Sequence, residues 1–137
     1  MNAFLEERQS IGNRLNDNWG VSNPVAPTPY ILWPNADDKR PNKEPWIAFY
    51  LVTGNKIPAS IVNGSVYGVG SIVIDIAIPL NIADILAYKL ADHIMSIFHN
   101  VQFGSVWTES VNINNEGFVK DNFYILKTET IYHIKTC

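Results

Sequence analysis

Residues 71–98 read SIVIDIAIPLNIADILAYKLADHIMSIF and contain the two patterns that decide the fold. Isoleucines occupy every second position from Ile72 to Ile78, and this period of two is typical of a strand with one buried face. Asp75 would then lie on the opposite face. Pro79 ends the strand because proline has no N–H for the ladder.

The second pattern predicts a helix from Asn81 to His99. Asn81 is a favourable N-cap, Asp84 follows three residues later, and Asn100 can take the left-handed position after the helix. The apolar stripe is wide enough to cover one face of a sheet. It comprises Ile82, Ile85, Leu86, Leu90, Ile94, Ile97 and Phe98.

A shorter helix is predicted near the N-terminus, over residues 2–16. Phe4, Arg8, Ile11 and Leu15 fall on one helical face. The run Asn16-Asp17-Asn18-Trp19-Gly20 is expected to end the helix because its short polar residues and glycine favour turns.

Four further strands follow from composition and alternation. The segment 46–52 is rich in aromatic and β-branched residues with both faces apolar, which predicts a central strand buried on two sides. Residues 30–33 suit a short edge strand that Pro34 ends, and residues 105–112 suit a further strand. In the last segment, 122–134, one face carries Tyr124, Leu126, Thr128, Thr130, Tyr132 and Ile134, whereas Lys127, Glu129 and His133 make the other face at least half wet.

These elements predict an α+β fold in one domain spanning residues 1–137. We expect a mostly antiparallel β-sheet with an N-terminal helix and one long helix packed on one face. Two segments interrupt it. A Pro-rich loop at 20–45 holds six of the eight prolines. Residues 56–69 mix strand formers with proline and glycine, which predicts a flexible β-arm that becomes ordered on assembly.

Composition excludes several classes of function. The formal charge of -3 argues against a broad basic surface for nucleic acid, so we expect no direct nucleic-acid recognition. The single cysteine, Cys137, can form neither an internal disulfide nor a cysteine metal cage. No run of 18 apolar residues occurs and the first residues are acidic, so we expect neither a membrane span nor a signal peptide.

The residues with catalytic potential do not form a convincing site. His93 and His99 are six residues apart, and a triad of Asp92, His93 and Ser96 would need side chains that neighbours on a helix do not bring together. Residues 64–70 are glycine-rich but lead into a strand, unlike a phosphate-binding loop. The four tryptophans are expected in core and interface. We therefore predict a non-enzymatic protein without catalytic, cofactor-binding or metal-binding residues.

Asp75 leaves two interpretations open. It could be a buried catalytic carboxylate with a raised pKa. Alternatively, it lies on the open face of the sheet and pairs with Lys or Thr on a neighbouring strand, which we favour.

The distribution of charge points to an interface. From Trp46 to Ile78 the formal charges are Lys56 and Asp75 alone. A small domain cannot hide so long a segment, so a second chain is expected to cover part of it. The predicted interface comprises Lys56, Ile57, Ile61, Val62, Val66, Tyr67, Val69 and Asp75.

The layout resembles the phage tail terminator and minor tail proteins of siphophages and prophages. Its N-terminal helix ends in Asn16-Asp17-Asn18-Trp19-Gly20, and Trp33-Pro34-Asn35 precedes the proline-rich loop. Trp46-Ile47-Ala48-Phe49, strand 71–78 and Pro79-Leu80 follow. In the helix after them, residues 90–98 are similar to that group's Leu-Ala-Asp-x-Ile-x-x-Ile-Phe pattern.

The resemblance implies a structural protein that self-associates into a hexameric ring on the tail. Its partners would be the major tail tube protein and a head-completion or neck protein, and it would carry no cofactor. Its location would be the head-proximal end of the virion tail, after assembly in the host cytoplasm. The alternatives are a head-completion or neck adaptor and a small-molecule-binding module or enzyme. The last would need a pocket that holds Asp75 or His133 with a convergent partner.

Overall fold

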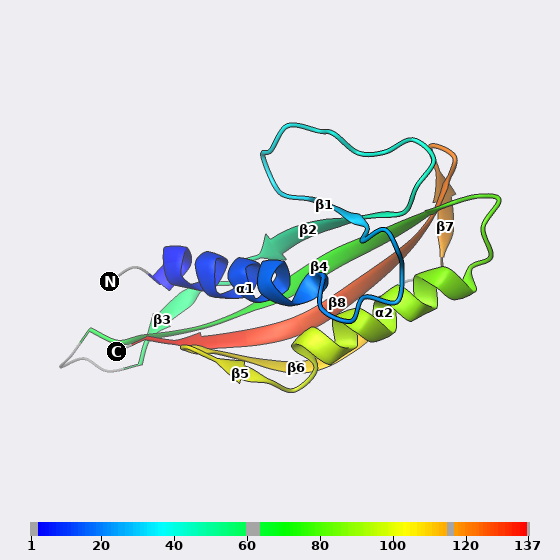
Figure 1. Ribbon diagram of the computed structural model, residues 1–137. Helices are drawn as coiled ribbons and strands as arrows, with labels where there is room; N and C mark the ends of the chain where they lie inside the picture. The colour runs from blue at the N-terminus through cyan, green and yellow to red at the C-terminus, as the bar shows by residue number, and fades with distance from the viewer. Residues whose placement is uncertain (1–2, 60–63, 115–116, 137) are drawn as a thin grey trace.

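The computed structural model describes residues 3–59, 64–114 and 117–136, and it confirms the α+β fold (Figure 1). Two helices, α1 (Ala3–Trp19) and α2 (Ile85–Phe98), lie on one side of a curled sheet. The described strands are β1 (Tyr30–Leu32), β2 (Trp46–Val52), β3 (Lys56–Pro58), β4 (Val66–Pro79), β5 (Gln102–Phe103), β6 (Val106–Ile113), β7 (Phe118–Lys120) and β8 (Phe123–Lys135).

The sheet is mostly antiparallel, as predicted. Its order is β1-β2-β4-β8-β6-β5, with β3 paired to β4 and β7 paired to β8. The β1–β2 pair is parallel. Strands β4 and β8 form the long centre of the sheet, in register from Tyr67 opposite Lys135 to Pro79 opposite Phe123.

Strand β4 begins five residues earlier than the alternation predicted. Gly68 and Gly70 do not interrupt it, because a large side chain crosses the backbone at each of them. A Cβ atom at Gly70 would lie 2.5 Å from Oη of Tyr132, and one at Gly68 would lie 2.4 Å from Cδ of Lys56. The glycines therefore mark close packing within the sheet. Residues 60–63, which include the predicted interface residues Ile61 and Val62, lie outside the described residues.

The core lies between the sheet and the two helices. The isoleucines at 72, 74, 76 and 78 of β4 are at most 1% exposed. Leu90, Ile94 and Phe98 of α2 are fully buried in the same core cluster. The same cluster includes Ile11, Leu15 and Trp19 of α1. The long helix therefore covers one face of the sheet, as its apolar stripe predicted.

Both helices differ from their predicted bounds. Helix α2 starts at Ile85, and its N-cap Asp84 makes no side-chain capping bond, so the prediction of Asn81 as the cap was wrong. Ile82 and Ile85 are 39% and 61% exposed. Ile82 precedes the helix, and Ile85 lies on the side of its first turn that faces away from Leu90, so neither belongs to the buried stripe. Asn100 does adopt a left-handed conformation, with φ of 47°.

Helix α1 continues through the polar run that was expected to end it. Trp19, 2% exposed, packs into the core and donates its indole N–H to the Pro29 carbonyl at 2.9 Å. Burial of this side chain outweighs the weak helix preference of the residues before it. At the other end, Phe4 is 60% exposed and does not join Ile11 and Leu15 in the core.

Strand β2 lies beside the edge strand β1 and is not central. Val52 at the end of β2 is 53% exposed. The predicted burial of both faces is therefore correct only for the first residues of the strand, near Trp46. Strand β7 was not predicted. It joins β8 through Asp121 and Asn122, whose φ angles of 52° and 66° fit a two-residue type I′ turn.

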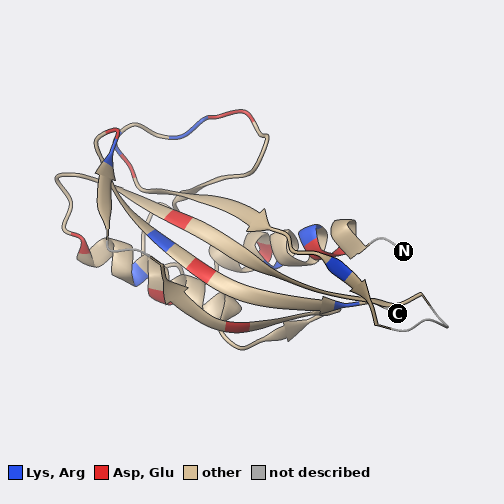
Figure 2. Ribbon diagram, turned by 180° about the vertical axis from the view of Figure 1, so that it is seen from behind, with Lys and Arg blue, Asp and Glu red and all other residues tan. Residues whose placement is uncertain are grey.

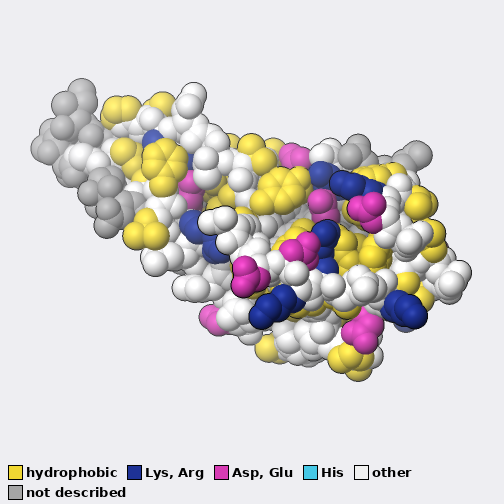
Figure 3. Space-filling model, turned by 90° about the horizontal axis from the view of Figure 1, so that it is seen from above, with side chains coloured by type: hydrophobic (Ala, Val, Ile, Leu, Met, Phe, Trp, Pro, Cys, Tyr) yellow, Lys and Arg dark blue, Asp and Glu magenta, His cyan; other side chains and the backbone are white. Residues whose placement is uncertain are grey.

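The second half of the Pro-rich loop arches over the β2 side of the sheet (Figure 1). Seen from above, positive and negative side chains intermingle there instead of gathering by sign (Figure 3). Such a surface has no strong attraction for a partner of one charge.

Candidate functional site

The face of the sheet opposite the helices, here called the open face, is the candidate site. Figure 2 looks onto this face, with the strands in front and the helices behind. Alternation along β4 and β8 places Asp75 and Lys127 on it, opposite each other in the ladder. Toward β7, Trp46, Ala77, Phe123 and Ile125 form a small buried cluster on this face. Neither of the two described helices covers the rest of this face.

An exposed patch occupies the other end of the open face, and we define it as Val52, Ile57, Val69 and Ile131. These side chains are between 37% and 54% exposed. The register brings them together: Ser71 lies opposite both Val52 and Ile131, on either side of β4. Ile57 pairs with Tyr67, two residues from Val69. The patch therefore spans the neighbouring strands β2, β3, β4 and β8.

A cluster of polar and aromatic side chains borders this patch. His133 stacks on Trp107 with the ring planes 5° apart and the centroids at 5.2 Å. Its Nδ1 lies 2.7 Å from Oη of Tyr67, and its Nε2 lies 2.7 Å from Oε2 of Glu109. With both ring nitrogens engaged, the imidazole is held in place as a cross-strand link. Among the described residues, neither a nucleophile nor an oxyanion hole completes a catalytic site around this imidazole.

Lys56, a predicted interface residue, is used inside the chain. Its Nζ lies 3.0 Å from Oε2 of Glu7 on α1 and donates to the Gly54 carbonyl at 3.2 Å. The side chains of Lys56 and Glu7 are 8% and 0% exposed. Tyr132 donates to the same Glu7 oxygen at 3.0 Å, and its burial, together with the nearby carboxylate, raises the pKa of Tyr132. The ion pair ties β3 to α1 and β8.

The other predicted interface residues are distributed over the arm and the open face. Ile57 and Val69 belong to the exposed patch, and Tyr67 contacts His133. Val66 is half-buried, and its carbonyl accepts from the backbone N–H of Thr136. The interface itself stays a prediction. Trp107 and Ile131 were missed, although their positions on alternating strands could have placed them on this face.

Asp75 lies on the open face, as favoured. Its Oδ1 is 3.5 Å from Nζ of Lys127, which donates to Oη of Tyr50 at 2.9 Å. Burial raises the pKa of Asp75, although the attraction of Lys127 opposes that rise. The bond to Tyr50 raises the pKa of Lys127.

The raised pKa of Asp75 predicts a pH-dependent effect of substitution. A carboxyl with a folded pKa above its unfolded value favours folding most when protonated, and this contribution is lost as pH rises through the folded pKa. We therefore expect Asp75→Asn to be at least as stable as the parent at pH 7, with a gain under about 1 kcal/mol because solvent screens the site. The gain should vanish below the pKa of Asp75. Urea unfolding at pH 7 and pH 3.5 measures it, and a loss of stability at pH 7 would contradict it.

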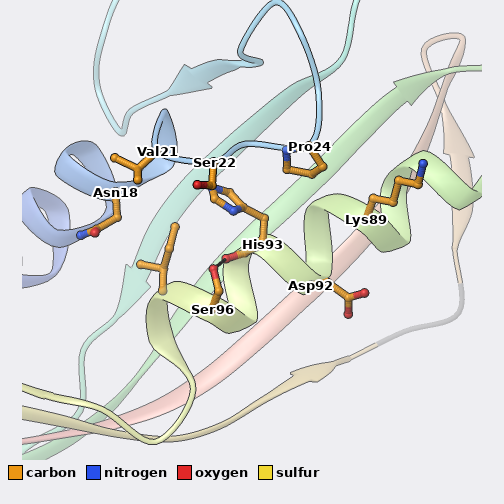
Figure 4. A pocket seen from close by; sticks show the side chains of 9 residues that line it. Asn18, Val21, Ser22, Pro24, Lys89, Asp92, His93 and Ser96 are labelled. Atoms are coloured by element: carbon orange, nitrogen blue, oxygen red, sulfur yellow. Dashed lines mark hydrogen bonds between the residues drawn. The ribbon is translucent and has the colours of Figure 1, made fainter.

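A hollow of about 660 Å³ lies between the end of α1 and α2 and contains the triad candidates (Figure 4). His93 is 8% exposed, so it does not lie on the outer face of α2. Its Nε2 lies 2.9 Å from the Trp19 carbonyl, and Asp92 points away from its ring. Ser96 donates to the backbone carbonyl of His93 and not to the ring. These three side chains do not form a triad.

The structure provides no metal cluster among the residues that it describes. None of the described helices is long and apolar enough to cross a membrane. The tryptophans do not assemble into a stacking platform: Trp19 and Trp33 lie on the helix side, whereas Trp46 and Trp107 lie at opposite ends of the open face.

Comparison with known proteins supports the fold. No family model and no curated protein matches the sequence. A solved structure with 14% sequence identity superposes with a TM-score of 0.72, covering 100% of this chain and 99% of the other. At this identity the similarity shows a shared fold alone.

Proposed function

We propose that the protein is a non-enzymatic structural subunit of a ring that caps a phage tail tube and joins it to the neck. The proposal rests on the resemblance of the sequence to tail terminators and on the surface of the chain. The observation that carries most weight is the exposed patch on the open face of a sheet whose other face is covered by both helices.

A second exposed apolar surface lies on the opposite side of the molecule. Ile85, Tyr88 and Met95 are 61%, 43% and 40% exposed, and their spacing places them along one outward side of α2. A ring repeats one heterologous contact, in which two different surfaces of the subunit meet. The exposed patch and this outward side of α2 are such a pair. Burying both surfaces would stabilise the ring contact by roughly 25 cal/mol for each Å² of apolar surface removed from water.

A charge introduced on either of the two surfaces tests the proposal. Val69→Glu and Ile85→Glu should each abolish incorporation into tails while leaving the fold intact, because a carboxylate would be desolvated in the ring contact. Val21→Glu is the matched control, since Val21 is 61% exposed outside both surfaces. Incorporation is measured as copies per purified tail, with imaging of the head-proximal tip.

The possible results separate the candidates. A hexameric set of copies at the head-proximal tip supports the terminator role. Copies on heads that lack tails would indicate a neck adaptor instead. A single copy, or copies spread along the tube, would exclude the ring that caps it, and normal incorporation of both variants would exclude these two surfaces.

A further inference from the structure

Strand β7 (Phe118–Lys120) forms an exposed edge of the sheet, at the end away from the exposed patch. It pairs with β8, and no other described strand pairs with it (Figure 1). All three of its residues are exposed, with Phe118 at 41% and Val119 at 63%. The outer side of β7 is therefore open to solvent along its whole length.

Other edges of the same sheet carry proline, and β7 does not. Edge strand β1 lies between Pro29 and Pro34, and β3 ends at Pro58, which has no N–H to offer. Natural sheets protect their edges with proline, charge or a covering segment, because an open edge can pair with another chain. Since two of the three residues of β7 are apolar, this edge is a candidate for such pairing.

The hairpin geometry decides which backbone groups of β7 face outward. Lys120 and Phe123 flank a two-residue turn, so they form a hydrogen-bonded pair of the ladder. Such pairs alternate along an antiparallel ladder, so the next pair, Val119 with Tyr124, is not hydrogen-bonded. The N–H and the C=O of Val119 therefore both point away from β8. An occupant that satisfies both groups must present a C=O and an N–H of its own, as an extended strand does.

The sequence of β7 is complementary to itself in the antiparallel direction. If a second copy pairs through Val119, this residue lies opposite its own counterpart, and the two exchange both backbone hydrogen bonds. β-Branched side chains opposite each other are a favourable cross-strand pair. On the other face of the sheet, Phe118 lies opposite Lys120 of the second copy, where the ammonium can contact the aromatic ring. The two-fold symmetry makes this contact twice.

We propose that β7 is a pairing edge for a second copy of this chain, which joins two sheets across a two-fold axis at Val119. A two-fold contact uses the same surface of both subunits, and β7 meets this condition with three residues. Because the edge is short and buries little area, the dimer is weak and depends on protein concentration. It uses neither the exposed patch nor the outward side of α2, so the inference does not depend on the proposed ring.

Sedimentation equilibrium of the full chain, from about 10 µM to about 1 mM, measures the association. The parent is expected to change from monomer toward dimer within this range. Val119→Pro should stay monomeric, because proline removes the outward N–H and leaves the hydrogen bonds to β8 intact. Val119→Ile is the matched control, since it keeps the N–H and the β-branched side chain and should dimerise like the parent. Circular dichroism checks that both variants are folded.

A second pair of variants tests the register without proline. Phe118→Glu places a carboxylate opposite Lys120 of the second copy, whereas Phe118→Lys places two ammonium groups opposite each other. The dimer of Phe118→Glu should therefore be the tighter of the two by about fivefold or more. Any association that does not use this register should show the reverse order, because the formal charge of -3 already repels and a further glutamate increases it.

Three results would overturn the proposal. The first is a parent that remains monomeric at about 1 mM. The second is a dimer of Val119→Pro as tight as that of the parent, which would mean that association uses another surface. The third is association of Phe118→Lys that equals or exceeds that of Phe118→Glu, which would exclude the antiparallel register through Val119.

Discussion

Lys56→Met is expected to destabilise the fold by about 3–5 kcal/mol, because it strands the Glu7 carboxylate in the core. Glu7 is 0% exposed and keeps just the Tyr132 hydroxyl as a described partner once the ammonium is gone. A glutamate on the buried side of α1 cannot reach water without unwinding the helix. The free energy of unfolding in urea measures the loss, with an unchanged m-value showing that the unfolded state is the same.

A double-mutant cycle separates the unpaired charge from lost packing. Glu7→Gln should cost less, about 1–3 kcal/mol, since Lys56 lies on the arm and its long side chain can turn toward solvent. The double variant Glu7→Gln/Lys56→Met has no unpaired charge, and it should recover most of the stability lost by Lys56→Met. If the double variant is as unstable as the sum of the two single variants, the residues do not act as a buried pair.

This pair also marks the limit of sequence reasoning on the fold. Strand β4 and helix α2 were predictable because their side chains repeat with the period of a single element. Glu7 and Lys56 are 49 positions apart, and a glutamate within a helix carries no local signal of the cation with which it will pair. Their pairing depends on how α1 crosses the sheet, which no local pattern encodes.

The glycines of the arm show a second limit. Gly68 and Gly70 interrupt a strand pattern, and in the sequence they were indistinguishable from a flexible segment. The reason for their presence lies on other elements, where Lys56 and Tyr132 cross the backbone of β4. A glycine that leaves room for a side chain of another element cannot be recognised as such before the position of that side chain is known.

The open face was partly predictable. Alternation along β4 and β8 placed Asp75 and Lys127 outward, and the scarcity of charge from residue 46 onward indicated a surface in need of a partner. The cavity of about 640 Å³ beside Trp46 and Asp75 was not predictable. One of its walls is a loop of mixed charge, and the position of that loop depends on the contact between Arg40 and Trp46. Loops without periodicity leave such contacts undetermined.

Leu90→Ala is expected to cost about 2–5 kcal/mol of folding free energy, through lost burial and the cavity that the truncation leaves. Leu90 is fully buried at the centre of α2, in the core cluster with Ile94 and the isoleucines of β4. Alanine is the best helix former, so the substitution does not weaken the helix itself. Urea unfolding of both proteins under the same conditions measures the difference.

Ile85→Ala on the same helix provides the matched control, because it removes a similar side chain from a position that is 61% exposed. Its cost in the free protein should stay within about 0.5 kcal/mol, as is usual for surface substitutions. The contrast between the two variants therefore reports burial and not the loss of an apolar side chain in general. A loss below about 1 kcal/mol for Leu90→Ala would mean that α2 does not cover the sheet. Equal losses for both variants would mean that the outward side of α2 is already buried in the free protein, and it could then no longer serve as one half of the proposed ring contact.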